Sequence, residues 1–405
     1  MGSYRKTIRR SIPEFAALRI AYVTHYFPPA GFAASENTYR IVNGLVERGH
    51  EVIVFCPQAF SKYTMATVMQ RSNFPFKVHR SLPTPLPLST TLPHLFNFLR
   101  AFRNQYDLVI TQFHLFHLAS LSGFMLKVLK GKPWIVRVHD MIPDATIPNP
   151  FFEQILINSS YGALLKNIGK KADRLLVLTN ELRGLLAENG HSPSKVAVVP
   201  NGVDTKTFCP PTFKDDSSVQ KSILYVGSLN PEDGVDRLIK AFSCIAKRNG
   251  CSVVIIGDGP ERSPLIELAK KLNMKRRVTF YRYVPHDSIS EFIKQSYFTV
   301  GPLRFSPINA YTIPSKILEY FACGKPVVSS PVSKDILIDE FNGLVAREVN
   351  PETIAEKFSI LLEDEKLAAL MGKNARQLVV EKFDWEEILN QIEKEVLNLG
   401  SRGPN

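Results

Sequence analysis

The chain has 405 residues, of which 44% are hydrophobic and 22% are charged, and this balance excludes a largely disordered protein. Its five cysteines form no CxxC pair, so neither a disulfide framework nor a zinc site is expected, and a reducing, cytoplasmic setting fits best. The net charge of +12 lies entirely in residues 1–203, which hold 23 Lys and Arg against 11 Asp and Glu. A one-sided basic surface attracts anionic lipid, acidic glycans or nucleic acid, and the alternative is a solubilising charge with no partner.

Short apolar runs alternate with helical patterns along the first half of the chain. Strands are predicted at 18–23, 51–56, 107–111, 133–138, 173–178 and 195–199. Between the first two, residues 36–48 place their apolar side chains on one helical face. This alternation is typical of βαβ units and of a parallel sheet.

The alternation of strand and helix patterns is interrupted at 203–221, which contains two prolines and several acidic and serine residues. It then restarts, with strands predicted at 222–227, 251–257, 277–281, 297–301 and 326–329 and helices at 234–248, 261–272, 315–323, 351–362, 366–381 and 385–398. We therefore predict two doubly wound, Rossmann-like α/β domains that face a central cleft. The first covers 1–203, a linker covers 204–221, the second covers 222–384, and 385–405 supplies a C-terminal helix.

Glycines follow several of the predicted strands. Gly31 lies in the turn after the first strand, and Gly227 and Gly257 end the first two strands of the second domain. Ligands of open parallel sheets bind beyond the carboxyl ends of the strands, so these turns fit backbone contacts to phosphate or to a nucleobase. An ordinary structural turn is an equal alternative for each glycine taken alone.

The most specific segment is PSKILEYFACGKPVV at 314–328. Pro314 suits the start of a helix, where Ser315, Lys316 and Glu319 occupy the first turn and a half. Lys316 and Glu319 are three residues apart and share one helix face. The lysine can contact phosphate oxygens and the glutamate can accept ribose hydroxyls. The alternative, a solvated ion pair, is less favoured because small and apolar residues surround the two.

Two segments of the first half contain histidines that could bind a ligand. His139 and Asp140 follow the strand predicted at 133–138, where a polar pair is well placed for a sugar, although a lone histidine there is more often structural. His114 and His117 could share one helix face, but no third ligand accompanies them. We therefore expect no metal.

Residues 85–103 predict a basic amphipathic helix. Phe96 and Phe102 lie among its apolar residues, and Arg100 and Arg103 supply its charge. These four residues are candidates for contact with an anionic membrane. A helix packed on its own domain is the safer interpretation. No run of about 18 apolar residues predicts a membrane span, and the dispersed basic residues form no nucleic-acid recognition module.

Seven segments in order resemble glycosyltransferase family 4 over nearly the whole chain. They are FPPAG at 27–31, LVERGHEV at 45–52, ADRLLVLTNELRGLL at 172–186, VVPNGVD at 198–204, LYVGSLNPEDGVDRLIKAF at 224–242, IIGDGPE at 255–261 and ILEYFACGKPVV at 317–328. The resemblance implies the GT-B fold, with the acceptor on the first domain and the nucleotide-sugar on the second. It also implies retention of the anomeric configuration, no metal or other cofactor, and a C-terminal helix that crosses back to the first domain.

The resemblance also implies roles for single residues. Gly31 would face the donor diphosphate, His139 would contact the sugar and Glu319 would hold the ribose. The predicted catalytic residues are His139, Asp140 and Lys316. The predicted donor-binding residues are Gly31, Gly227, Ser228, Gly257, Asp258, Arg282, Tyr283, Arg304, Pro314, Ser315, Lys316 and Glu319.

Three positions depart from the family pattern. Ser228 and Asp233 stand where an Arg and a Lys usually bind the diphosphate, and Tyr311 stands at the first position of the usual Glu-x7-Glu pair. A subgroup resembling sugar-polymer transferases has PSK before the glutamate, as this chain does. We expect Lys316, with Arg304 or Arg282, to supply the missing positive charge.

The sequence thus predicts a retaining transferase that moves a sugar from a nucleotide-sugar to a glycan or polyprenyl-linked acceptor, in surface-glycan or glycoprotein synthesis at the cytoplasmic face of a membrane. A degenerate nucleotide-sugar-binding protein with the same fold is the main alternative, because of Ser228 and Asp233. Another GT-B enzyme, an epimerase or phosphorylase, is less favoured. No motif specifies the base, the sugar or the acceptor.

Overall fold

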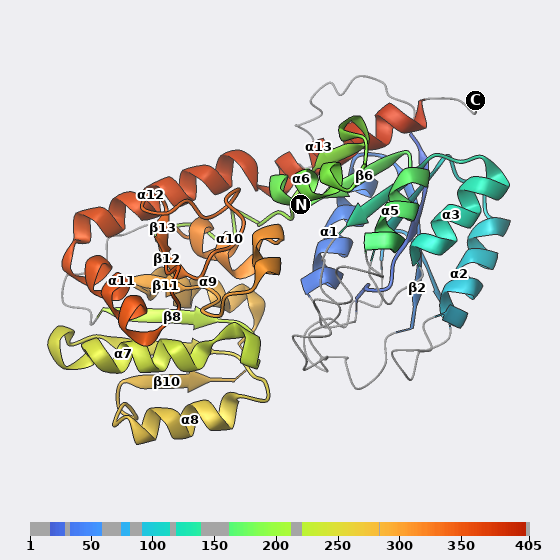
Figure 1. Ribbon diagram of the computed structural model, residues 1–405. Helices are drawn as coiled ribbons and strands as arrows, with labels where there is room; N and C mark the ends of the chain where they lie inside the picture. The colour runs from blue at the N-terminus through green and yellow to red at the C-terminus, as the bar shows by residue number, and fades with distance from the viewer. Residues whose placement is uncertain are drawn as a thin grey trace, which may run out of the picture.

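The computed structural model describes residues 17–28, 33–58, 74–81, 91–113, 119–138, 162–211, 221–282 and 284–401. Within these ranges the chain forms two wholly parallel sheets, each with helices on both faces (Figure 1). The predicted fold of two doubly wound α/β domains is confirmed.

The first sheet has seven strands in the order β3-β2-β1-β4-β5-β6-β7. They are β1 (Arg19–Val23), β2 (Glu51–Pro57), β3 (Lys77–Ser81), β4 (Leu108–Phe113), β5 (Trp134–Val138), β6 (Arg174–Val177) and β7 (Val196–Val198). β3 was not predicted from the sequence, because this edge strand reads KVHRS and is only partly buried. The strand order reverses between β1 and β4, which makes their carboxyl ends the ligand edge of this sheet.

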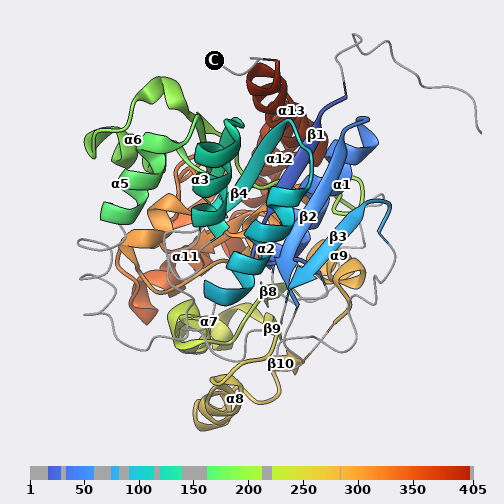
Figure 2. The same cartoon turned by 90° about the vertical axis from the view of Figure 1, so that its right-hand side faces the viewer.

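Helices bury both faces of the first sheet. In β1, Ile20 and Tyr22 pack into one core, while Ala21 and Val23 pack into the other. α1 (Ala33–Glu47) and α13 (Trp385–Gly400) cover the first of these faces. α2 (Thr91–Arg103), α3 (Ala119–Lys130), α5 (Gly162–Lys171) and α6 (Asn180–Glu188) cover the second, and Figure 2 shows α2 and α3 side by side. Because both faces are buried, most strands are continuous apolar runs.

The second sheet has six strands in the order β10-β9-β8-β11-β12-β13. They are β8 (Ser222–Val226), β9 (Ser252–Ile256), β10 (Val278–Tyr281), β11 (Phe298–Val300), β12 (Val327–Ser329) and β13 (Gly343–Val345). One face packs on α7 (Val235–Asn249), α8 (Arg262–Lys271) and α11 (Pro351–Glu363), and the other on α9 (His286–Gln295), α10 (Ser315–Ala322) and α12 (Glu365–Lys382). Two elements were not predicted from the sequence: β13, which has only three residues, and α9, whose first turn is polar.

The last helix joins the two halves. α12 lies over the second sheet, and α13 continues over the first, where it packs on α1 (Figure 1). Gly44 of α1 lies directly against the side chain of Leu389. Arg48 pairs with Glu386 at 2.7 Å and with Glu393 at 3.2 Å. The C-terminal helix is thus bound to the first domain by close packing and by ion pairs.

A second contact between the halves involves the start of α6. The backbone N–H and the side-chain amide of Asn180 donate to the Asp335 carboxylate at 2.6 and 2.9 Å. In return, the Glu181 carboxylate accepts from Ser333 Oγ at 2.8 Å and from the Lys334 N–H at 2.9 Å. Asp335 therefore caps the start of α6, a helix end that favours negative charge, and Glu181 caps a turn of the second domain.

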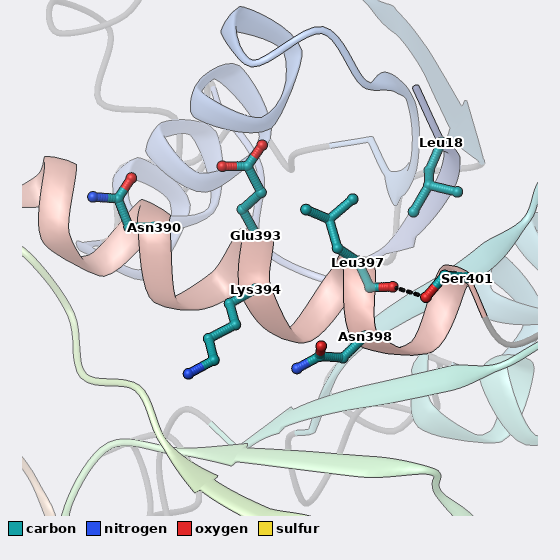
Figure 3. A pocket seen from close by; sticks show the side chains of 8 residues that line it. Leu18, Asn390, Glu393, Lys394, Leu397, Asn398 and Ser401 are labelled. Atoms are coloured by element: carbon teal, nitrogen blue, oxygen red, sulfur yellow. Dashed lines mark hydrogen bonds between the residues drawn. The ribbon is translucent and has the colours of Figure 1, made fainter. Parts of the chain in front are cut away.

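A cavity of about 410 Å³ lies beside the C-terminal part of α13 (Figure 3). Its lining comes from Leu18 and from α13 residues including Glu393 and Leu397. The cavity borders the first domain, and none of the predicted donor-binding residues lines it. None of the described helices is both long and apolar enough to cross a membrane.

Candidate functional site

The site lies where the strand order of the second sheet reverses, between the carboxyl ends of β8 and β11. Gly227 follows β8 and Gly257 follows β9. The Gly227 N–H donates to the Ile256 carbonyl at 3.0 Å, and a Cβ on Gly257 would overlap the carbonyl oxygen of Gly227. The two turns are therefore packed backbone against backbone, which is possible only with glycine at 257.

Tyr320 fixes α10 against the end of β8. Its phenol accepts from the Val226 N–H at 2.8 Å and donates to the Val226 carbonyl at 3.3 Å. Lys316 lies one turn earlier on the same helix, so its ammonium group reaches the Gly227 turn, where a Cβ on the glycine would lie 2.5 Å from Nζ. Glycine at 227 thus leaves room for the lysine.

Lys316 forms a network with Ser228 and Asp233, two of the residues that depart from the family pattern. Its Nζ donates to Tyr225 Oη at 2.9 Å and to Asp233 Oδ1 at 3.2 Å. Ser228 Oγ donates to the other oxygen of the Asp233 carboxylate at 2.8 Å. The Lys316 and Asp233 side chains are 16% and 12% exposed. Burial, reinforced by the charge of Asp233, raises the pKa of Tyr225 well above its usual value, so Tyr225 is a neutral phenol.

Glu319 has a partner that the sequence analysis missed. His286, at the start of α9, places Nε2 2.9 Å from Glu319 Oε1. The ring of Phe208 packs edge-on against the His286 ring at 5.2 Å between centroids. No motif of the sequence pairs positions 286 and 319, which come together only because α9 and α10 cover the same face of the sheet.

The other predicted donor-binding residues occupy different places. Arg304 follows β11 and lies 3.6 Å from the Asp236 carboxylate. Burial opposes ionisation of Asp236, but the hydrogen bond and charge of Lys240, together with the charge of Arg304, lower its pKa below the usual value. Arg282 is exposed after the edge strand β10, two strands from β8. Asp258 is exposed and accepts the N–H of Gly259 at 3.0 Å.

Pro314 is the N-cap of α10 and Ser315 is its first residue. Tyr311, just before the helix, accepts a hydrogen bond from Thr179 Oγ at its carbonyl, and its ring packs on the core of the first domain. The segment that leads into α10 therefore contacts the first domain directly. Gly31, His139, Asp140 and Tyr283 lie outside the described residues, as do His114 and His117.

The four candidate membrane residues lie at the surface of α2. Phe96 and Phe102 are 44% and 39% exposed, and Arg100 and Arg103 are exposed beside them. On the neighbouring helix α3, Val128 and Leu129 are also exposed. Within the described ranges, no three His, Cys, Asp or Glu residues are grouped so that they could hold a metal ion.

Two parallel-sheet domains, with polar groups gathered at the switch point of the second, define a GT-B glycosyltransferase fold. Two family models match the chain: one described as "Glycosyltransferase Family 4" over residues 34–207, and one described as "Glycosyl transferases group 1" over residues 213–378. The chain is a family 4-like glycosyltransferase, as its sequence motifs predict.

Relatives agree with this assignment. An uncharacterized glycosyltransferase of Methanocaldococcus jannaschii is 22% identical, over 86% of this chain and 90% of its own. The alpha-D-kanosaminyltransferase of Streptomyces kanamyceticus is 24% identical, over 68% of this chain and 72% of its own. The crystal structure of Anabaena HepE in complex with UDP has a TM-score of 0.74 and 16% identity, and the match covers 94% of this chain and 100% of HepE.

Proposed function

We propose that this enzyme transfers a sugar from a nucleoside diphosphate sugar to a glycan or polyprenyl-linked acceptor, with retention of the anomeric configuration. One observation carries the proposal. Lys316 and Glu319 lie at the start of α10, and the lysine ammonium lies against the Gly227 turn at the sheet's switch point. This spacing suits a diphosphate beside the lysine and a ribose beside the glutamate. The UDP and UDP-glucose complexes of the structurally similar HepE support a donor of this class.

Lys316 supplies the positive charge for the leaving group. Among the described residues its ammonium donates to Tyr225 and Asp233, so one of its three N–H groups remains for a phosphate oxygen. Glu319 keeps one carboxylate oxygen for a ribose hydroxyl, because His286 contacts the other. Protein charge and the positive end of α10 then stabilise the departing diphosphate without a metal.

In the proposed reaction, the bond from the anomeric carbon to the diphosphate oxygen breaks. A bond from the same carbon to the acceptor oxygen forms on the same face of the sugar. The acceptor proton passes to an oxygen of the leaving phosphate, so atoms and charge balance. His139 and Asp140 would contact the sugar, and Gly31 would face the diphosphate from the first domain. These three roles rest on the sequence motifs.

We further infer that the enzyme works at an anionic membrane surface on the cytoplasmic side. The exposed apolar side chains of α2 and α3 support this, together with Arg100 and Arg103. No acidic residue occurs in either helix. A face of this kind binds a bilayer by apolar insertion and by attraction to anionic headgroups. Sedimentation with vesicles containing anionic lipid tests it, with Phe96→Ser/Phe102→Ser as the variant that loses binding.

The experiment that tests the transfer reaction is a donor screen. Purified enzyme is incubated with UDP-, GDP-, ADP- and TDP-sugars, and free nucleotide is measured. Release from one of them supports the proposal and names the base. The second candidate function, a binding protein that has lost catalysis, is favoured by the pairing of Lys316 with Asp233. Nucleotide binding without release from any donor, in the presence of mixed glycan and lipid acceptors, would favour that candidate.

A further inference from the structure

The lysine proposed to bind the diphosphate is already paired with a carboxylate. We propose that Asp233 is a built-in counter-ion for Lys316. Its carboxylate weakens the binding of nucleoside diphosphate, because the donor must displace it from the lysine. This inference rests on the proposed function, because it assumes that Lys316 contacts the donor diphosphate. It also gives a role to Asp233, which stands where the family pattern has a cation.

The geometry places the carboxylate where an incoming phosphate would compete with it. Asp233 Oδ1 lies 3.2 Å from Lys316 Nζ, while its Oδ2 is held by Ser228 Oγ at 2.8 Å. Both residues of the pair are mostly buried, so solvent screens their attraction only in part. The ammonium group is thus paired with a negative charge, and two acceptors, Tyr225 and Asp233, hold it in one position.

Arg304 is the neighbouring cation at the switch point, and it too is paired with a carboxylate. Arg304 faces the carboxylate of Asp236, which also pairs with Lys240. A diphosphate that enters this site brings negative charge next to Asp233, and like charges at such distances repel. Binding must therefore overcome both the Lys316–Asp233 attraction and the repulsion by the carboxylate. Removing the charge of Asp233 while keeping its shape should strengthen diphosphate binding.

Asp233 also has a local structural role, which the test must separate from the electrostatic one. Its Oδ2 accepts the N–H of Asn230 at 3.3 Å, at the N-cap of the turn Pro231–Asp233. Asp233→Asn keeps one acceptor oxygen for this turn and removes the charge, and it replaces the other carboxylate oxygen with an amide nitrogen. Asp233→Glu keeps the charge. Asp233→Ser is a second neutral variant that keeps a hydroxyl acceptor, in case the asparagine variant fails to fold.

The test is calorimetric titration of the whole enzyme with UDP, GDP, ADP and TDP and with the matching monophosphates. For the base that binds, Asp233→Asn should lower the Kd of the diphosphate about tenfold, since one charge is removed beside the ligand. The gain should be smaller for the monophosphate and should shrink in 0.5 M salt. Asp233→Glu should bind like the wild type. Glu267→Gln, which removes an exposed carboxylate on α8, is the control and should change nothing.

The outcomes separate this inference from the proposed function. If both neutral variants fold, as melting temperature shows, yet bind diphosphate no more tightly than the wild type, the counter-ion role is overturned. The donor screen with wild-type enzyme is unaffected by that result, so the proposed function would stand. If Lys316→Ala leaves diphosphate affinity unchanged, the assumed contact is absent, and both proposals lose their basis.

Discussion

Nε2 of His286 lies 2.9 Å from Oε1 of Glu319, which joins the first residue of α9 to the donor-site face of α10. The contact occupies one carboxylate oxygen and orients the other. Phe208, in the segment between the two sheets, packs against the same histidine ring. His286 is therefore placed to position Glu319, and the segment that links the domains supports it.

His286→Ala should weaken donor binding about tenfold, because a hydrogen bond to a charged group contributes about 1.5 kcal/mol or more when it is lost. The measurement is the KM for the donor, compared with that of a 2′-deoxyribose donor analogue. The loss should be smaller for the analogue if His286 acts through Glu319 on the ribose. His286→Gln, which retains a donor group, should recover part of the affinity. An equal loss with both donors would contradict the positioning role.

Gly257→Ala should abolish nucleotide release, since the new Cβ would overlap the Gly227 carbonyl and force apart the two turns that frame Lys316. Gly184→Ala is the matched control, because a Cβ at that exposed position of α6 meets no atom within 4 Å. Turnover of both variants is measured alongside their circular dichroism. Full activity of Gly257→Ala would show that the packing of these turns does not shape the site.

The reciprocal caps between the domains should hold them together. Glu181→Ala/Asp335→Ala removes four hydrogen bonds, and each exposed polar contact of this kind contributes about 0.5–1.5 kcal/mol. We expect a larger radius of gyration by small-angle X-ray scattering and a lower kcat. The melting temperature of each domain should change little. A scattering profile identical to that of the wild type would mean that α13 alone fixes the domain arrangement.

Acid should destabilise the protein through its buried histidines. Burial, followed by the charges of Lys170 and Lys166, lowers the pKa of His191 below its ordinary value of 6.5. Below about pH 6.5 the unfolded chain therefore binds a proton that the folded chain excludes. The free energy of unfolding keeps its full value above about pH 6.5, and it decreases as the pH falls toward the pKa of the folded state. The melting temperature should drop between pH 7.5 and 5.5, and less steeply for His191→Gln. Parallel curves for the two proteins would contradict this assignment.

The features that could be predicted from the sequence are those with a local cause. Strands such as β1 and β2 are buried on both faces and therefore appear as largely apolar runs. Lys316 and Glu319 could be assigned to the same site because residues three positions apart lie on the same face of a helix. The strand β3 could not be predicted from its polarity pattern, because it is a half-exposed edge strand with the polar sequence KVHRS.

The rest of the site depends on contacts between distant segments. The Asp233–Lys316 pair joins positions 83 residues apart, and His286–Glu319 joins positions 33 apart. No sequence spacing predicts either pair, because the partners lie on separate segments that only the folded sheet brings together. Sequence comparison marked Asp233 only as a departure from the family pattern. The structure adds that this departure and Lys316 contact each other directly.

The most direct test of the central claim is nucleotide release by wild-type enzyme and by Lys316→Ala, measured side by side with the donor that the screen identifies. The claim is that Lys316 binds the donor diphosphate and stabilises it as it leaves. We predict that the variant folds normally and that kcat/KM falls at least a hundredfold, since removing one charged contact to a developing anion typically costs about 2.7–4 kcal/mol. Unchanged kcat/KM in the folded variant would contradict the account.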